Sequence, residues 1–169
     1  IFSDDYKGGY LMGNYFARRG YTDIMMYSVN LQCAEQRYSG MKQALNEHGI
    51  KFDRDNVVMC TNENCGDLTA RLVQSDRIPD AIFCFNDIMA LETRAYICSS
   101  ADERVRKTEV TGYDNIHSHF KVFESIVTID TDKKLMADTA IEILKNRLES
   151  NAGRQYVKVD VQLETGGAK

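Results

Sequence analysis

Four polar side chains of the kinds that bind hydroxyl-rich molecules follow predicted strands of this sequence. They are Arg37, Thr61, Asn86 and Asp114. A carboxylate accepts strong hydrogen bonds, an amide both donates and accepts, and an arginine presents a planar fork of donors. Ligands of open α/β sheets bind beyond the carboxyl ends of the strands. These positions therefore predict a binding site for a sugar or a related metabolite.

The chain lacks the usual residue patterns of enzyme chemistry. It has no Ser-His-Asp order, no glycine-rich phosphate loop and no pair of carboxylates suited to acid–base catalysis. The alternative function is that of a doubly wound enzyme such as a phosphotransferase, and the absence of these patterns disfavours it. We therefore expect a binding protein that is not an enzyme and that needs no cofactor.

Each candidate residue also has a purely structural interpretation. Asn86 and Asp87 open a predicted helix, where either could be an N-cap while the other binds a ligand. Asp114 could simply form a turn with Asn115. Arg37 could interact only with Glu35 or with the dipole of the first helical turn. If Arg37 and Asp114 are buried, each needs a ligand or the other nearby, because an unpaired buried charge is costly.

Apolar residues recur with two alternating periods along the chain. Alternating or continuous apolar runs predict strands over 23–28, 56–60, 80–85, 108–113, 125–129 and 156–163. Helical spacing predicts helices from Gly8-Gly9 to Gly20 and over 37–47, 67–74, 87–97 and 132–148. Strands that alternate with helices favour an α/β fold, with a mainly parallel, twisted sheet and helices on both faces.

Composition limits the partners. The net charge of −4 and the pI of about 5.4 do not suit a DNA-binding surface. No apolar run reaches the roughly 18 residues of a membrane span, and no signal peptide opens the chain. Five widely spaced cysteines predict free thiols in a reducing cytoplasm and no zinc site. His117 and His119 are expected on a solvated loop.

Several motifs resemble the lactose-repressor/galactose-repressor family of bacterial transcription regulators. The most specific is PDAIFCFNDIMAL at 79–91. The family's Arg-x-x-Gly helix is matched by RYSGM at 37–41, and its later strands by VTGYDN at 110–115 and VTI at 127–129. SDDYKGG at 3–9 is similar to the start of the family's second lobe. The likeness spans about residues 1 to 163.

The resemblance implies a two-lobed, periplasmic-binding-protein-like effector domain. Residues 1–129 would form its C-terminal lobe, 130–150 a helix that belongs to the N-terminal lobe, and 151–169 a returning strand and tail. DNA would be bound only through a helix-turn-helix head outside this chain, and most of the first lobe would also lie outside it.

The resemblance also implies roles for individual residues. Arg37, Asn86 and Asp114 match second-lobe residues that contact sugars in ribose-binding relatives. Thr61 falls where a purine-binding relative places an aromatic contact. The loop 29–34 is shorter than in that relative, so no contact is carried over to it. The ending ETGG at 164–167 departs from the family's usual Arg-x-Ser.

Two further expectations follow. The apolar stripe of the late helix would be partly bare without the first lobe, so we expect self-association through this helix or its displacement, and a homodimer. The stripe comprises Leu135, Met136, Thr139, Ile143 and Leu144.

The alternative function, from the same fold, is that of a periplasmic sugar-binding transport protein. The free cysteines and the motif at 110–115 weigh against it.

Overall fold

The computed structural model describes residues 1–75, 77–116, 126–150 and 153–165. Its centre is a four-stranded sheet of β2 (Ile24–Ser28), β3 (Val57–Met59), β4 (Ala81–Cys84) and β5 (Glu109–Thr111). The strand order is β3-β2-β4-β5, and every neighbouring pair is parallel. The predicted α/β fold with a mainly parallel sheet is confirmed.

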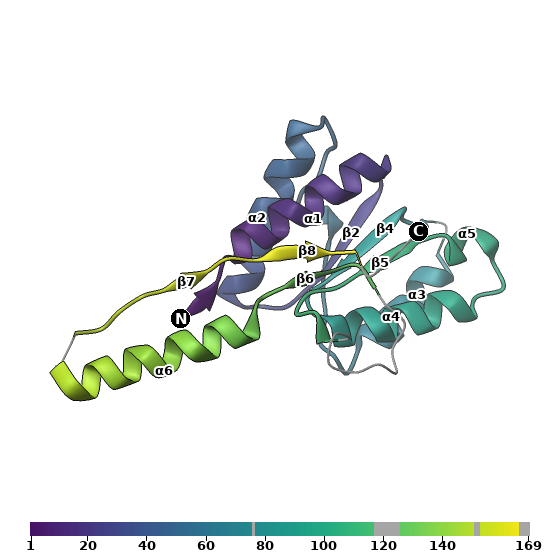
Figure 1. The fold of residues 1–169 in the computed structure, drawn as a ribbon. Coiled ribbons are helices and arrows are strands. Elements are labelled where there is room, and N and C mark those ends of the chain that lie inside the picture. Colours follow the sequence, from purple (N-terminus) through teal and green to yellow (C-terminus); the bar gives the residue numbers. More distant parts are fainter. Residues whose placement is uncertain (76, 117–125, 151–152, 166–169) are drawn as a thin grey trace.

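Helices cover both faces of this sheet (Figure 1). α1 (Asp5–Arg19) and α2 (Gln32–Glu47) pack on one face, while α3 (Cys65–Val73), α4 (Asp87–Ser99) and the short α5 (Glu103–Arg106) pack on the other. Side chains alternate along a strand, so Met26 and Phe83 join the first core while Tyr27 and Ile82 join the second. Burial on both faces explains the continuous apolar run of β4.

The prediction that the first helix starts after Gly8-Gly9 was wrong. α1 begins at Asp5, because the Asp4 carboxylate accepts a hydrogen bond from the Lys7 backbone N–H and caps the helix. Its glycines serve packing instead: a Cβ on Gly9 would lie 1.9 Å from the carbonyl oxygen of Arg37 in α2. The two helices can thus approach closely.

Several other boundaries also differ. α2 begins at Gln32 rather than at residue 37, and α5 and the 3-10 turn η1 (Arg54–Asn56) were not predicted. The predicted strand 156–163 is two strands, because the pairing partner changes within it. β7 (Lys158–Val159) pairs in parallel with β1 (Phe2–Ser3), and β8 (Gln162–Glu164) pairs antiparallel with β6 (Thr128–Asp130).

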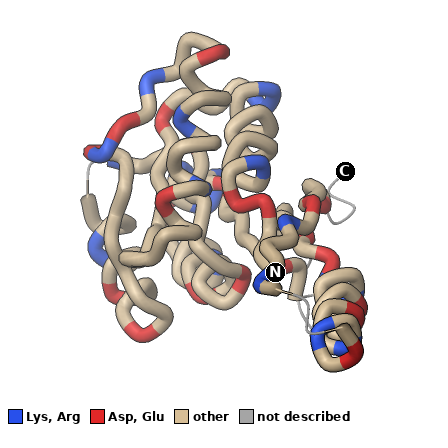
Figure 2. The backbone as a smooth tube through the Cα atoms, turned by 90° about the vertical axis from the view of Figure 1, so that its left-hand side faces the viewer, with Lys and Arg blue, Asp and Glu red and all other residues tan. Residues whose placement is uncertain are grey.

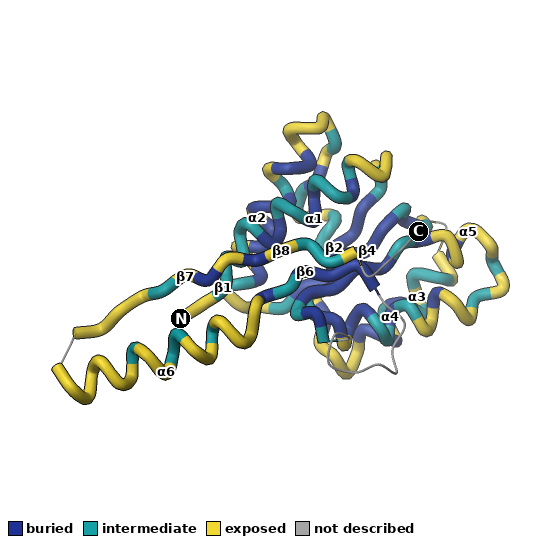
Figure 3. The backbone as a smooth tube through the Cα atoms, in the orientation of Figure 1, coloured by how far each residue is buried: buried dark blue, intermediate teal, exposed yellow. Residues whose placement is uncertain are grey.

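α6 (Lys133–Ser150) extends away from the sheet, and Figure 3 shows it mainly exposed. None of its described residues is buried. Leu135 and Leu144 are 48% and 60% exposed, so the expectation of a partly bare apolar stripe is confirmed. No helix among the described ranges is both long enough and apolar enough to cross a membrane.

Candidate functional site

The candidate site lies at the carboxyl edge of the central sheet, which is the side where its four parallel strands end. The chain order reverses between β2 and β4, because β3 lies on one side of β2 and β4 on the other. The loops after these strands therefore diverge, and such a switch point is where open α/β sheets form ligand crevices. α2 follows β2 and α4 follows β4, so both helices begin at this edge.

Arg37 is the centre of this edge. Its side chain is buried, and its Nε donates to Asp5 Oδ1 at 2.8 Å while Nη1 donates to the Phe85 carbonyl oxygen at 2.6 Å. The guanidinium Cζ also lies 3.3 Å from the centroid of the Tyr113 ring. Arg37 thus joins α1, the end of β4 and the end of β5. Pairing of Arg37 with Glu35 was wrong.

Glu35 has another partner. It forms an exposed ion pair with Arg54, whose Nη1 lies 2.9 Å from Glu35 Oε1. Glu35 and Arg37 are two positions apart on α2, and residues with that spacing do not share a helix face. Because of this, the buried side of α2 presents Arg37 to Asp5 and leaves Glu35 in solvent.

Asp114 follows β5 in a tight turn. Its φ is 101° and that of Asn115 is 49°, so both residues adopt left-handed conformations and the turn-forming interpretation holds. The Asp114 N–H donates to Ile129 O at 2.9 Å, and its carbonyl accepts from Lys133 Nζ. Burial raises the pKa of the Asp114 carboxyl, and the nearby charges of Arg37 and Lys133 lower it. Arg37 and Asp114 therefore interact electrostatically.

Asn86 caps α4, as the structural interpretation predicted. Its Oδ1 accepts from the Met89 N–H at 2.9 Å, which leaves the Nδ2 amide to donate to Asn62 Oδ1 at 3.3 Å. Asp87 is buried and serves the fold, because it accepts from Thr128 Oγ1 at 2.6 Å and from the Ile116 N–H at 2.8 Å. Asn86 thus contacts the loop after β3 at the same edge.

Thr61 lies in that loop, between β3 and α3. Its side chain is exposed, and its backbone N–H donates to Asn64 Oδ1 at 2.7 Å. Among the described contacts, Asn62 rather than Thr61 connects this loop to Asn86. The structure therefore gathers Arg37, Asn86 and Asp114 around one edge and leaves Thr61 at the rim of the loop.

Sequence reasoning missed two members of this edge, Asp5 and Tyr113. Asp5 is the partner of Arg37, and it follows β1, which is only two residues long. The rule that ligand-binding residues follow strands would have found Asp5 had it been applied to this first strand. Tyr113 is fully buried beneath Arg37, and burial raises the pKa of its hydroxyl.

A groove begins beside this ion pair, with a volume of about 680 Å³. Asp5 lines it together with Gln32, Cys33 and Gln36 from the start of α2 and Tyr156 from the returning segment. Arg37, Asn86 and Asp114 are not among its lining residues, so the groove lies next to these three side chains rather than over them.

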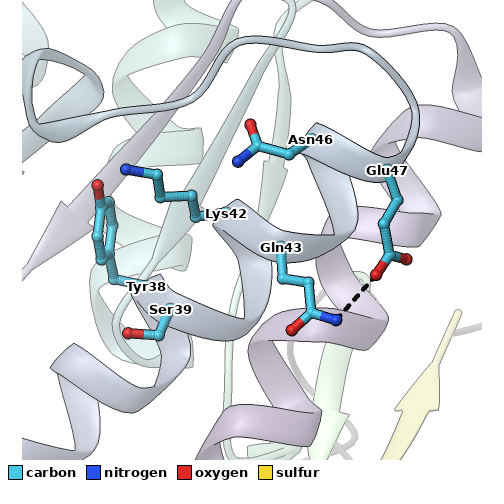
Figure 4. A pocket seen from close by; sticks show the side chains of 6 residues that line it. All are labelled: Tyr38, Ser39, Lys42, Gln43, Asn46 and Glu47. Atoms are coloured by element: carbon cyan, nitrogen blue, oxygen red, sulfur yellow. Dashed lines mark hydrogen bonds between the residues drawn. The ribbon is translucent and has the colours of Figure 1, made fainter.

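Two other possible sites offer less chemistry. A shallow pocket of about 520 Å³ lies on α2 between Tyr38 and Glu47, where Gln43 Nε2 donates to Glu47 Oε1 at 2.8 Å (Figure 4). It contains no predicted site residue. The described residues hold no group of three or more His, Cys, Asp or Glu side chains placed to bind a metal ion. His117 and His119 lie outside the described residues.

The fold agrees with that of a known family. Residues 14–167 match the periplasmic binding protein-like domain, and the chain therefore belongs to that family. Among curated relatives, it is similar to the HTH-type transcriptional repressor PurR of Vibrio atlanticus (strain LGP32). The two are 31% identical in an alignment of 154 positions, which covers 88% of this chain and 46% of the relative. The chain spans about half the length of the curated relatives it matches.

Solved structures agree on the fold. A LacI family transcriptional regulator from Enterococcus faecium with bound ribose matches with a TM-score of 0.79 and 22% identity, over 99% of this chain and 65% of that one. The Caulobacter myo-inositol binding protein matches with a TM-score of 0.82 and 20% identity, over 98% of this chain and 59% of that one. The predicted resemblance to the lactose-repressor/galactose-repressor family is confirmed, and the curated relative is named as a repressor rather than an enzyme.

Proposed function

We propose that this chain is the effector-sensing part of a bacterial transcription regulator whose effector is a sugar or a related metabolite. The observation that carries the proposal is the buried Arg37, held between Asp5 and the Phe85 carbonyl at the carboxyl edge. Asn86 follows β4 and Asp114 follows β5, so both lie at the same edge. This set of donors and acceptors suits hydroxyl groups, which need both.

In this proposal each side chain has a distinct role. The carboxylate of Asp114 accepts from ligand hydroxyls, the Nδ2 hydrogen of Asn86 that does not face Asn62 donates, and Arg37 orients Asp5 while it offers its remaining N–H groups. Thr61 contributes a hydroxyl from the rim. Proteins of similar fold support this ligand class, since one was solved with bound ribose and another with bound myo-inositol.

The proposed parent protein supplies the remaining parts. Residues 1–129 act as the C-terminal lobe, 130–150 pack on the N-terminal lobe, and 151–169 return between the two. DNA is contacted through a separate head, and the regulator acts in the cytoplasm as a homodimer. The effector binds one of two lobe arrangements better and so shifts the population toward it.

The alternative is a periplasmic sugar-binding transport protein, which the fold match to the myo-inositol binding protein keeps open. All five cysteines are free, which favours a reducing compartment. The gene start distinguishes the two functions: a helix-turn-helix supports the regulator, and a signal peptide supports transport.

Calorimetry on the full-length protein tests the proposal. A panel of pentoses, hexoses, cyclitols and nucleosides should contain a ligand whose affinity falls at least about tenfold in Asp114→Ala. Asp55→Ala is the matched control, because Asp55 is exposed in η1, before β3, at the opposite edge of the sheet.

The 169-residue chain itself should bind that ligand weakly or not at all, since half of the cleft is contributed by the other lobe. Equal affinity of the wild type and Asp114→Ala would contradict the proposed site. Micromolar binding by the isolated chain would contradict the two-lobe mechanism.

A further inference from the structure

A second pocket opens at the amino edge of the sheet, at the opposite end of β5 from Asp114. Its volume is about 280 Å³, and it is bounded by Glu109 at the start of β5, by Tyr21 after α1 and by Cys98 near the end of α4. None of its described lining residues belongs to the candidate effector site. Its chemistry can therefore be considered separately.

This pocket is rich in positive charge, although the chain as a whole carries −4. Four cationic side chains line it: Arg19, Arg94, Arg106 and Lys107. Among the described lining residues, Glu109 is the only carboxylate. A cavity that concentrates cations on an acidic protein attracts anions, because the local field rather than the net charge acts on a small ligand.

The carboxylate of Glu109 already has partners within the protein. Its Oε1 accepts from the Tyr15 hydroxyl and its Oε2 from the Tyr21 hydroxyl, both at 2.5 Å. Arg19 Nε lies 3.5 Å from the same carboxylate. Both oxygens of Glu109 thus accept hydrogen bonds from tyrosines within or just after α1.

Arg106 is held in place by neutral partners. Its Nη1 donates to the carbonyl oxygens of Ser100 at 2.7 Å and Ala101 at 3.0 Å. These contacts use both hydrogens of Nη1 and orient the guanidinium, whose charge also lowers the pKa of the Asp102 carboxyl. Nε and Nη2 then form the fork of donors for an anion. Lys107 pairs with Glu103 at 2.9 Å, but both side chains are over 70% exposed, and such a pair is weak.

Apolar side chains also line the pocket. They are Ile97, Val110, Ile126 and Val127, all of which are buried. We propose that this pocket binds a small organic anion, a phosphate monoester or a carboxylate, with its charged group on Arg106 and Lys107 and its body against these side chains. The site is independent of the effector edge and gives the regulator a second small-molecule input.

Cys98 provides a direct test, because it is exposed and lines the pocket. Iodoacetamide alkylation of the purified chain is followed peptide by peptide by mass spectrometry, with the half-buried Cys33 as an internal control. Ribose 5-phosphate should slow Cys98 alkylation by about threefold or more and leave Cys33 unchanged, since a bound anion covers the thiol. Neutral ribose and sodium chloride at equal ionic strength should have no effect.

Succinate in place of ribose 5-phosphate distinguishes a carboxylate site from a phosphate ester site, and protection by either supports the proposal. Arg106→Gln and Lys107→Gln should each reduce the protection, whereas Arg71→Gln, exposed on α3 and outside the pocket, should retain it. Asp114→Ala should also retain it. The proposal is overturned if neither anion protects Cys98, or if both pocket variants, folded by circular dichroism, are protected like the wild type.

Discussion

The guanidinium of Arg37 lies over the ring of Tyr113, with Cζ 3.3 Å from the ring centroid. This contact joins α2 to the end of β5, and the hydrogen bond to the Phe85 carbonyl joins it to the end of β4. One side chain thus determines how three segments meet at the candidate site. Substitutions at Arg37 and at its neighbours can separate its structural role from theirs.

Replacing Arg37 tests this junction. Arg37→Lys keeps the charge but loses the planar fork to Asp5 and Phe85 and the stacking on Tyr113. We expect the free energy of unfolding in urea to fall by about 2–3 kcal/mol, because the Asp5 carboxylate is left buried without its full set of donors. Arg71→Lys on the exposed face of α3 should change it by less than about 0.5 kcal/mol. Equal effects of the two substitutions would contradict this structural role of Arg37.

Asn86 has two roles that conservative replacements can separate. Asn86→Asp keeps an oxygen for the Met89 N–H, so the α4 cap should survive and stability should change by a few tenths of a kcal/mol. Asn86→Ala removes the cap and should cost about 1 kcal/mol. Both variants lack the donor amide, so calorimetry on the full-length protein should show weaker effector binding in both. Full affinity in Asn86→Asp would limit Asn86 to capping.

The ionisation of Asp114 should make stability depend on pH. Burial raises its pKa in the folded state, so the folded chain favours the protonated carboxyl. That contribution to stability is fully present below the unfolded pKa and is lost as the pH rises through the raised folded pKa.

Asp114→Asn should therefore gain stability relative to the wild type as the pH rises from about 3 to 7, measured by urea unfolding. In the full-length protein the same variant should bind effector less tightly. Asp55→Asn in η1 serves as the exposed control. A stability difference between Asp114→Asn and the wild type that stays constant with pH would contradict the assigned shift.

The sequence predicted the central sheet well because its strands are buried on both faces and lie next to clear helical patterns. β4 and its neighbour β2 are entirely buried, and both fell within the predicted ranges. The short elements were not predictable in this way. α5 has four residues, too few to display a period, and it is capped locally by the side chain of Asp102.

The residues of the site also differ in how far the sequence could predict them. Arg37, Asn86 and Asp114 could be found because each follows a recognisable strand. The pairing of Arg37 with Asp5 spans 32 positions and depends on where α1 begins, which the Gly8-Gly9 pair obscured. Because glycine allows close helix packing as well as helix ends, its presence did not distinguish a boundary from a contact.

Asp87 should prove a purely structural residue. It accepts from Thr128 Oγ1 and the Ile116 N–H, and it lies against Gly112, where a Cβ would come within 2.1 Å of Oδ1. Asp87→Ala leaves these buried donors unsatisfied and should reduce the free energy of unfolding by about 2–4 kcal/mol. Asp67→Ala, exposed in the equivalent first turn of α3, should have little effect. A small loss for Asp87→Ala would mean that water replaces its contacts.

The bare stripe of α6 should drive the isolated chain to self-associate. Leu144 is 60% exposed, and the described part of the helix has no buried residue with which to pack on its own sheet. Lysine, arginine, aspartate and glutamate all occur along it, so no single charge sign keeps two copies apart (Figure 2). We expect sedimentation velocity to show a concentration-dependent dimer, because paired helices bury apolar area that water otherwise covers. Leu144→Lys together with Ile143→Lys should shift the population to monomer, and the same number of lysines at Asn146 and Glu149 should not. A wild-type chain that stays monomeric at every concentration would contradict the proposed role of α6.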